Sequence, residues 1–330
     1  MNSKTIVLIF LDGLNGINYH RLMTPFVRLR AEEGVNIHFF QSYNELKTFD
    51  LTKVKAVVTS RRCTVTDHKA FKQFLVKNDI KLILDNDDFW KLPKDNDAHK
   101  YYRKIAGPDI LNTIKIADEI WTPSEYLGER MKKLNPDVPI RLVPNTVYEK
   151  EEQWADIEKE PTDVVRFGYL GANGHMADVK SMGMTFEDYE LYCTHLGGRV
   201  ASEGHYDQYL NAKHQLWPKD IHQYASFYKK FDVSLAPLLG GSFNKSKSNL
   251  KVVEAAFTRT AIIASNVTPY KECIKHNKTG ILCDNGDDWK KAVKEMTLER
   301  ARELAHELYE DFKDKYNLSK INKERLKGLV

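Results

Sequence analysis

The stretch DVSLAPLLGGSFNKSKSNLKVVEAAFTRTAIIASNVTPYKE, residues 232–272, contains the pattern that decides the fold. A short apolar strand is predicted up to Pro237, a glycine-rich loop follows it, and a helix is predicted to begin near Asn249. A second apolar strand follows at residues 261–264. Strand, loop, helix and strand in this order form the unit from which parallel α/β sheets are built.

The start of this predicted helix is a candidate site for a diphosphate. The first backbone N–H groups of a helix have no partner within it, and the helix dipole favours an anion there. Lys247 adds a positive charge beside this end, and Glu254 lies further along the helix, where it can accept hydrogen bonds from ribose hydroxyls. The same residues also fit an ordinary capped surface helix with a solvated lysine, and local chemistry alone leaves both interpretations open.

The same alternation extends over the rest of the chain and predicts two α/β domains. In the first half, strands are expected at residues 4–10, 35–40, 54–59, 80–84, 119–122 and 140–143, with helices at 19–33, 66–77 and 102–117 and a further helix capped by Ser124. In the second half, strands are expected at residues 164–170, 189–195, 233–235, 261–264 and 280–283, with helices at 224–230, 249–257 and 298–313. Strands that alternate with helices imply a parallel sheet covered on both faces.

The length of the chain fits this division. Its 330 residues are too many for one ordinary core and suit two domains of roughly 150 residues each. We expect an N-terminal Rossmann-like domain at residues 1–148, a polar linker at 149–163 and a C-terminal Rossmann-like domain at 164–330. The basic tail, at about 315–330, is expected to pack back on the N-terminal domain. Doubly wound sheets bind ligands at the carboxyl ends of their strands, so the chemistry is expected on turns after strands of both halves.

Composition excludes several classes of protein. Hydrophobic residues make up 42% of the chain and charged residues 29%, which is typical of soluble globular proteins. A transmembrane helix is not expected, because the sequence contains no run of about 18 apolar residues. The four cysteines are scattered without zinc spacing, which favours a reducing cytoplasm, or the host cytoplasm if the gene belongs to a phage. A net charge of +4 fits an anionic ligand but is weak support for nucleic-acid binding.

Residues 243–272 resemble the donor-binding signature of family-4-type GT-B glycosyltransferases, in the variant form common in bacterial and phage genomes. That form reads roughly F-N-x-x-K-S-x-L-K-x-L-E-A, then a buried strand, then S-x-V-x-P-Y. The matching residues here are Phe243, Asn244, Lys247, Ser248, Leu250, Lys251, Val253, Glu254, Ala255, Ser265, Val267, Pro269 and Tyr270. Residues 224–238 and 167–182 also match the variant, the latter with Gly168, Gly171, His175 and Asp178 in the expected places. Most of the matching positions lie in the C-terminal half of the chain, and few lie in the N-terminal half.

The resemblance implies a GT-B fold, in which two Rossmann-like, doubly wound parallel-sheet domains face a central cleft. It also implies a nucleoside-diphosphate sugar as donor, UDP-sugar by default, held by the C-terminal domain. The sugar would pass to an acceptor hydroxyl with retention of configuration by front-face attack. No cofactor would be required, and no metal, since GT-B enzymes generally do not use one to hold the diphosphate.

The roles of the donor-site residues are also implied by the resemblance. Glu254 would bind the ribose, and Lys247 would neutralise the diphosphate and assist its departure. The contacts to the diphosphate would come from Ser248, Asn249 and Leu250. Gly171 would let the backbone approach the phosphates closely, with Asn173 and His175 nearby. One departure concerns Ser246, which stands where the usual Glu-x7-Glu motif has a glutamate that contacts the donor sugar.

The run Asp85–Asn86–Asp87–Asp88–Phe89–Trp90 follows the fourth predicted strand. Clustered carboxylates such as Asp87 and Asp88 can orient an acceptor hydroxyl, act as a general base or bind a metal. The alternative is a turn with one helix cap and solvated acids. The resemblance favours a functional role, because relatives carry an Asp-Asp-aromatic run at this point.

The first predicted turn contains Gly16, and the helix after it contains Arg21. Relatives have a Tyr-Arg-x-x-x-Pro arrangement here, and Tyr19, Arg21 and Pro25 resemble it with one extra residue between Tyr and Arg. On this basis we expect Gly16 and Arg21 to lie near the phosphates of the donor. The alternative is that Arg21 is a surface residue of an ordinary helix. Tyr101 and Tyr102 are expected to be packing residues or to line the lip of the cleft.

The identity of the acceptor stays open between a glycan, a lipid-linked or small molecule, and a hydroxymethylated pyrimidine base in DNA, as in phage enzymes. The donor base, the sugar (hexose or pentose) and the oligomeric state are open as well. The same fold also serves nucleotide-sugar epimerases. The serine at position 246 leaves room for a non-catalytic protein that only binds a nucleotide sugar.

Overall fold

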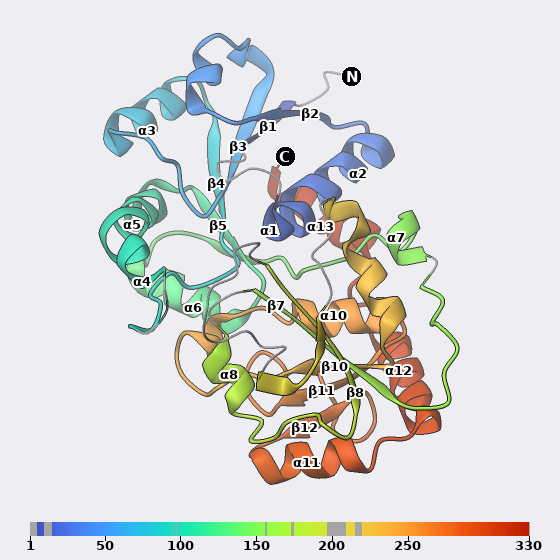
Figure 1. Cartoon of the computed structure of the whole chain (residues 1–330). Helices are drawn as coiled ribbons and strands as arrows, with labels where there is room; N and C mark the ends of the chain where they lie inside the picture. Colours follow the sequence, from blue (N-terminus) through green and yellow to red (C-terminus); the bar gives the residue numbers. More distant parts are fainter. Residues whose placement is uncertain are drawn as a thin grey trace. The chain divides into compact units, whose positions relative to one another are not determined.

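The computed structural model describes residues 5–9, 15–94, 96, 98–155, 157–172, 175–196, 209–214 and 220–329. Two compact units make up the chain. The first unit contains Met1–Thr146, Ser246–Ser248 and Leu318–Val330, and the second contains Val147–Lys245 and Asn249–Asn317. The chain therefore passes between the units at four points, and two of them lie inside the signature at residues 243–272. Figure 1 labels the elements of both units.

The first unit is built on a parallel sheet in the order β2-β1-β3-β4-β5-β6. Its strands are β1 (Thr5–Ile9), β2 (Asn36–Phe40), β3 (Val54–Ser60), β4 (Lys81–Asp85), β5 (Glu119–Thr122) and β6 (Ile140–Leu142). The central strands β3, β4 and β5 are almost wholly buried, as expected for parallel strands covered on both faces. The strand order reverses between β1 and β3, so the carboxyl ends of these strands mark the binding edge of the sheet.

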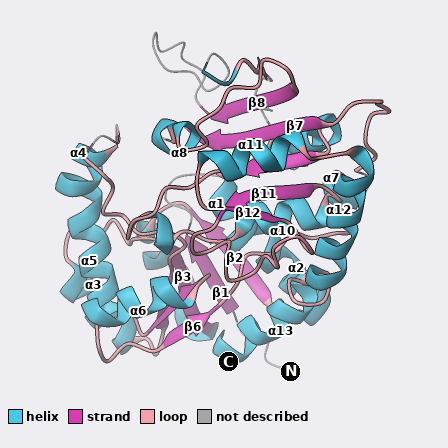
Figure 2. Cartoon of the chain, turned by 90° about the horizontal axis from the view of Figure 1, so that it is seen from below, coloured by secondary structure: helices cyan, strands magenta, loops and turns pink. Residues whose placement is uncertain are grey.

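Helices cover both faces of this sheet. They are α1 (Gly16–Asn18), η1 (Tyr19–Met23), α2 (Thr24–Glu33), η2 (Tyr43–Lys47), η3 (Leu51–Lys53), α3 (His68–Lys77), α4 (His99–Tyr101), η4 (Tyr102–Ala106), α5 (Gly107–Ile116), α6 (Glu125–Leu134) and α13 (Leu318–Leu329). The helices α3, α5 and α6 lie on one face, and α2 and α13 lie on the other (Figure 2). Alternation along the strands produces this layering: Val57 packs in the cluster on the α3 face, and Val58 packs with residues of α2 and α13.

The second unit has a parallel sheet in the order β12-β11-β10-β7-β8-β9. Its strands are β7 (Arg166–Ala172), β8 (Glu190–Leu196), β9 (Lys213–His214), β10 (Val233–Ala236), β11 (Ala261–Ser265) and β12 (Ile281–Cys283). Read from β9, this is the Rossmann order, with the reversal between β7 and β10. The helical segments of this half are α7 (Glu152–Ala155), α8 (Met176–Lys180), η5 (Ile221–Lys230), η6 (Asn244–Ser246), α10 (Leu250–Phe257), α11 (Gly286–Lys294) and α12 (Leu298–Phe312).

The predicted strands are all present, with ends shifted by no more than two residues. The predicted cap at Ser124 is also found, and its side chain accepts a hydrogen bond from the backbone N–H of Leu127. The helix expected at residues 66–77 begins at His68 and is capped by Asp67, which accepts from the N–H of Ala70. The helices α8, α11 and α13 and the short strand β9 were not expected. Within the part of the chain that is described, no helix is both long and apolar enough to cross a membrane.

A half-buried lysine joins three segments of the second unit. The Nζ atom of Lys159 donates to the backbone oxygens of Tyr228 and Phe231, at 2.5 and 2.9 Å, and to Oγ1 of Thr260 at 2.6 Å. Burial lowers the pKa of Lys159 to about 7. An unfolded lysine keeps its proton up to about pH 10.4, so the unfolded chain binds more protons than the folded one between these two values.

We predict that the free energy of unfolding rises with pH above 7 more steeply for the wild type than for Lys159→Met. The excess slope approaches about 1.4 kcal/mol per pH unit where the folded lysine has lost its proton and the unfolded one has not. Urea denaturation at pH 6, 7, 8 and 9 measures it. The exposed Lys69 of α3 provides the control, because Lys69→Met should leave the wild-type curve unchanged. Parallel curves for the wild type and Lys159→Met would contradict the prediction.

Candidate functional site

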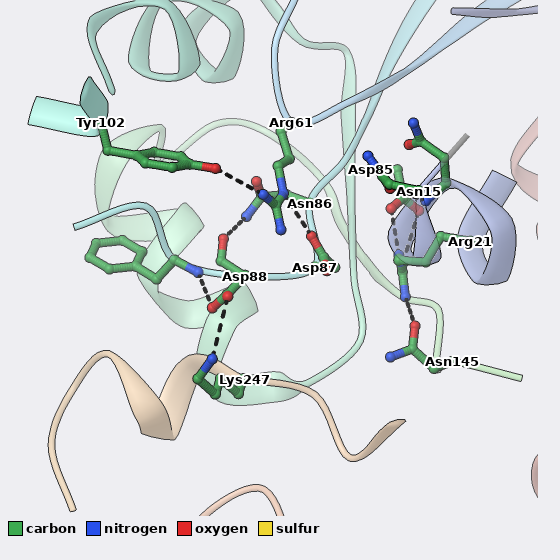
Figure 3. A network of polar contacts seen from close by, with 12 residues as sticks. Asn15, Arg21, Arg61, Asp85, Asn86, Asp87, Asp88, Tyr102, Asn145 and Lys247 are labelled. Carbon is green, nitrogen blue, oxygen red and sulfur yellow. Dashed lines mark hydrogen bonds and ion pairs between the residues drawn. The ribbon is translucent and has the colours of Figure 1, made fainter. Parts of the chain in front are cut away.

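Carboxylates are concentrated in the first unit directly after β4, and cations from other segments surround them (Figure 3). Asp85 is 1% exposed and pairs with Arg21, which is equally buried. Nε of Arg21 lies 2.5 Å from Oδ1 of Asp85, and a second guanidinium nitrogen lies 2.9 Å from Oδ2. Burial raises the pKa of Asp85, while the charge of Arg21 opposes that rise. The pair is thus bidentate and closed to water, an arrangement in which each charge depends on the other.

The remaining contacts of Arg21 are structural as well. Its NH1 group donates to the backbone oxygen of Val143 at 3.0 Å and to Oδ1 of Asn145 at 2.8 Å. The alternative that Arg21 is a surface residue is therefore wrong. Its buried guanidinium ties the start of the first helix to the ends of β4 and β6, and its expected place near a donor phosphate stays a prediction.

The extra residue between Tyr19 and Arg21 has a structural explanation. The segment η1 is a π turn, in which the N–H of Thr24 donates to the oxygen of Tyr19, five residues back. A π turn holds one more residue per turn than an α-helix, so it absorbs an insertion without breaking the helix. The helix therefore runs from Gly16 to Glu33 through the π turn, rather than from residue 19 as predicted. A Cβ atom added at Gly16 would meet no heavy atom within 4 Å, so the space beside this residue is open.

A second arginine, which the sequence did not single out, lies near Asp85. Arg325 of α13 is completely buried, and its NH1 group donates to Oδ1 of Asn322 at 2.8 Å. Burial and the neighbouring charge of Arg21 lower the pKa of Arg325 to about 9, against the opposing influence of Asp85. The last helix therefore brings a positive charge to the carboxylates that follow β4.

Asp87 is held by Arg61, which follows β3. Nε of Arg61 donates to Oδ1 of Asp87 at 3.0 Å, and NH1 donates to the hydroxyl oxygen of Tyr102 at 3.0 Å. Arg61 has a φ of 61°, in the left-handed region that costs a side-chain-bearing residue about 1–2 kcal/mol. The charges of Asp87, Tyr102 and Asp88 raise the pKa of Arg61 against the effect of burial.

Asp88 faces Lys247, so two residues that the sequence placed in the site by separate arguments lie together. Nζ of Lys247 is 3.8 Å from Oδ2 of Asp88, and Oδ1 of Asp88 accepts a hydrogen bond from the N–H of Phe89 at 2.8 Å. Burial raises the pKa of Asp88, and Lys247 opposes this rise. A carboxylate with a raised pKa is a better proton acceptor than an ordinary aspartate.

In the second unit, Asp178 organises the loop between β10 and α10. Its Oδ1 accepts from the N–H of Leu239 and from Nδ2 of Asn244, both at 2.8 Å. Its Oδ2 lies 2.7 Å from Nδ1 of His175, the residue at the start of α8. The predicted site residue His175 is thus fixed by Asp178 beside the carboxyl end of β7. Asn173, also a predicted site residue, lies outside the described residues.

Glu254 of α10 is 3% exposed and is oriented by two tyrosines. The hydroxyls of Tyr224 and Tyr228 donate to its Oε2 atom, at 3.2 and 2.9 Å. Burial, together with the charge of Glu254, raises the pKa of both tyrosines well above the usual value, so both remain hydrogen-bond donors. The sequence matched residues 224–238 to a family pattern but gave no reason for these tyrosines, since their partner lies on another helix.

Asn249 is the N-cap residue of α10, but its own side chain makes no capping hydrogen bond. The Nδ2 atom of Asn249 instead donates to the hydroxyl oxygen of Tyr316 at 2.7 Å. Ser248 and Leu250, on either side of Asn249, are half-buried.

Gly171 lies at the end of β7, next to the switch in strand order. A Cβ atom added there would come within 2.5 Å of the Tyr169 hydroxyl oxygen, so a larger residue would displace that ring. Nζ of Lys251 donates to the backbone oxygen of Leu170, which joins α10 to the same strand end. Ser246, where the usual motif has a glutamate, is completely buried. Among the described residues, no group of three or more His, Cys, Asp and Glu is placed to hold a metal ion.

Comparisons with known proteins agree with this architecture. Residues 189–298 match the family model described as "Glycosyl transferases group 1". The sucrose-phosphate synthase of Thermosynechococcus elongatus has a TM-score of 0.71 to this chain at 13% identity, with 98% of each chain covered. Anabaena HepE with UDP and glucose gives 0.63 at 11% identity, with 99% of each chain covered. The lipopolysaccharide outer core galactosyltransferase WaaB gives 0.61 at 13% identity, covering 99% of this chain and 100% of that one. No curated protein matches the sequence significantly.

The two parallel-sheet units and these likenesses define the GT-B fold. The matched model covers β10, α10 and β11, the elements that carry the donor signature. The chain therefore has the GT-B fold that its resemblance implied, and its residues 189–298 are similar to the glycosyltransferase group 1 family.

We predict that Arg21→Met lowers the free energy of unfolding by about 3–5 kcal/mol, because it leaves the carboxylate of Asp85 buried without its partner. The double variant Arg21→Met/Asp85→Leu should recover part of this loss, since it removes both charges. Urea denaturation at pH 7 measures both. As a control, Lys327→Met breaks the exposed pair with Glu324 and should change stability by less than about 1 kcal/mol. Equal losses for Arg21→Met and Lys327→Met would be incompatible with this account.

Proposed function

We propose that this protein transfers a sugar from a nucleoside-diphosphate sugar, UDP-sugar by default, to an acceptor hydroxyl with retention of configuration. The observation that carries the proposal is the carboxylate of Glu254, buried and oriented by two tyrosine hydroxyls on the helix that starts with the donor signature. The proposed site lies at the Rossmann-type switch between β7 and β10. Structures of Anabaena HepE hold UDP, UDP-glucose, or UDP with glucose, which supports a uridine nucleotide.

Glu254 binds the ribose in this proposal. An ionised carboxylate offers about four lone-pair sites to donors, and it accepts hydrogen bonds from vicinal hydroxyls well. Because Tyr224 and Tyr228 both donate to Oε2, the orientation of the carboxylate is set before a ligand arrives. A pre-oriented group loses less entropy on binding, so its contribution to affinity is larger.

The diphosphate lies at the start of α10. The side chain of Asn249 does not cap this end, and the first backbone N–H groups and the helix dipole favour an anion there. Lys247, two residues before Asn249 in the chain, supplies the positive charge. Gly171 lies near the end of β7, where the resemblance places the phosphates.

In the chemical step, the acceptor oxygen bonds to the anomeric carbon on the face from which the diphosphate leaves. The bond from that carbon to the phosphate oxygen breaks, and its electron pair leaves with the diphosphate. Asp88, whose pKa is raised by burial, takes the hydroxyl proton. Positioned N–H groups and Lys247 stabilise the charge on the departing diphosphate, each well-placed donor by about 3–4 kcal/mol. The proposed reaction needs no cofactor and no metal.

The four cysteines are all free, which fits a reducing cytoplasm, where we place the protein.

Whether the transferred sugar is a hexose or a pentose is decided by a thermal-shift panel of nucleotide sugars. A ligand present at about 100 times its dissociation constant adds about 2.7 kcal/mol to stability, which a melting curve resolves.

We predict that Lys247→Ala and Glu254→Ala each weaken binding of the donor about tenfold or more. The first variant removes the charge that faces the diphosphate, and the second removes the acceptor of the ribose hydroxyls. Isothermal titration with UDP and UDP-glucose measures the affinities. Lys245→Ala removes an exposed lysine two residues earlier and should leave the affinity unchanged. Unchanged affinity in both Lys247→Ala and Glu254→Ala would refute the donor site.

We also predict an acid limb in the pH profile of sugar transfer that depends on Asp88. Asp88 must be ionised to accept the hydroxyl proton, so the rate of transfer falls as the pH drops through the pKa of Asp88. Because burial raises that pKa, the fall occurs above the value of about 3.9 for an ordinary aspartate. Asp88→Asn should lower kcat by about 100-fold or more and abolish this limb, while UDP still binds.

The control for Asp88→Asn is Asp118→Asn, which removes a carboxylate that pairs with Lys72 in the same unit and should leave the profile unchanged. An Asp88→Asn enzyme with wild-type kcat would remove Asp88 from the mechanism.

A further inference from the structure

Arg61 follows β3 and has no part in the proposed mechanism, yet it contacts the surroundings of the proposed proton acceptor. Its Nε atom donates to Oδ1 of Asp87, and its NH1 group donates to the hydroxyl oxygen of Tyr102, both at 3.0 Å. Arg61, Asp88 and Tyr102 also line one small cavity. Figure 3 shows Arg61 between Tyr102 and Asp87, next to Asp88. Arg61 thus lies beside both carboxylates.

The backbone of Arg61 is fixed in an unfavourable conformation. Its φ is 61°, in the left-handed region that glycine adopts readily and other residues seldom do. Its N–H donates to the backbone oxygen of Asp85 at 2.9 Å, which ties it to the end of β4. Residues held in such regions cluster at functional sites, where the surrounding structure maintains them. This favours a function for Arg61 over a solvated surface charge.

The charges around Asp88 act on its ionisation in opposite directions. Burial raises the pKa of Asp88, Lys247 opposes this rise, the charge of Asp87 adds to it, and Arg61 opposes it. The other titratable side chain that lines the cavity is Tyr102, whose hydroxyl oxygen accepts from Arg61. The ionised form of Asp88 is therefore favoured by two cations from different segments and disfavoured by its neighbour in the chain.

Arg61 acts on Asp88 in two ways that have the same sign. Its positive charge attracts the ionised carboxylate of Asp88 directly, and its bond to Asp87 compensates a like charge one residue away. Neighbouring carboxylates repel each other, so a proton binds Asp88 more readily when Asp87 has no cationic partner. A protonated Asp88 cannot accept the proton of an acceptor hydroxyl.

We propose that Arg61 is a positioning residue for the transfer step, which binds Asp87 and thereby keeps Asp88 ionised and ready to accept the proton of the acceptor hydroxyl. The inference rests on the proposed function, in which Asp88 is the base. Arg61 contacts neither donor nor acceptor, and it acts through the two carboxylates. The hydroxyl of Tyr102 fixes the other edge of the guanidinium, so that Nε faces Asp87.

The ionisation of Asp88 can be measured directly, without a known acceptor. Aspartate labelled with ¹³C at the side-chain carboxyl carbon is followed by NMR from acid to neutral pH, and the signal absent from Asp88→Asn belongs to Asp88. Arg61→Met should raise the midpoint of Asp88 by about one pH unit, and Asp87→Asn should lower it by a similar amount. The double variant Arg61→Met/Asp87→Asn removes both charges and should titrate close to the wild type.

The matched control is Arg62→Met, which removes an arginine from the same loop. NH1 of Arg62 lies 3.6 Å from Oδ2 of Asp109, and NH2 donates to the hydroxyl oxygen of Tyr101 at 2.9 Å. Because neither partner is a carboxylate beside Asp88, this variant should leave the midpoint unchanged. Arg61→Lys keeps the positive charge, so it should reverse most of the shift seen in Arg61→Met.

The second readout is the pH profile of donor turnover, measured as release of UDP from UDP-glucose or from the nucleotide sugar that the thermal-shift panel selects. The acid limb should move with the NMR midpoint, upward for Arg61→Met and downward for Asp87→Asn, while the plateau rate above the limb changes little. Below both limbs, a shift of one pH unit makes Arg61→Met about tenfold slower than the wild type. A merely structural role would instead lower the plateau and leave the limb in place.

The possible results separate the inference from the function on which it rests. Unchanged midpoints of Asp88 in both Arg61→Met and Asp87→Asn would overturn the inference, and so would a lower plateau without movement of the limb. Either result leaves Asp88 and the donor site standing. A wild-type rate in Asp88→Asn, or absence of donor binding and of UDP release, would instead refute the proposed function.

Discussion

Burying carboxylates at the end of β4 is the constraint on which the first unit depends. A buried carboxylate is strongly unfavourable unless a cation and further hydrogen bonds compensate it. Each charge is met from a different part of the chain: Asp85 by Arg21 of the first helix, Asp87 by Arg61 after β3, and Asp88 by Lys247. These contacts fix where the first helix, the β3 loop and residues 246–248 lie within this unit. The proposed proton acceptor is part of the same network that holds the sheet edge together.

Two π turns supply side chains to this network. In η1, one extra residue lets Arg21 reach Asp85. In η4, the N–H of Gly107 donates to the backbone oxygen of Tyr102, and the hydroxyl oxygen of Tyr102 accepts a hydrogen bond from Arg61. A π turn weakens the regular hydrogen-bonding of a helix, and such turns persist mostly where they place a functional group. Here both occur beside the carboxylates that follow β4. Position 107 requires glycine, because a Cβ atom there would lie 2.5 Å from the backbone oxygen of Tyr102.

The sequence predicted the alternation of strands and helices because apolar periodicity and caps are local signals. Lys247 and Glu254 could be proposed as donor-site residues because they lie within one short pattern. The pairing of Arg61 with Asp87 was not predicted, because the two residues are distant in sequence and Arg61 lies in no motif. The extra residue before Arg21 was visible, but its consequence, a buried arginine paired with Asp85, depends on tertiary contacts with Asp85 and Asn145. The tyrosines that orient Glu254 were missed for the same reason.

The helix α13 has a consequence for biosynthesis. Ile321 and Leu329 pack in the same core cluster as Ile6 and Leu22, and Arg325 lies near Asp85. A ribosome adds roughly 5–20 residues per second, so the N-terminal half leaves it roughly 10–30 s before these side chains exist. During that interval the apolar face that α13 will cover is open to water and to chaperones. The first unit is thus begun before the second unit is synthesised, yet it is completed only after the second unit.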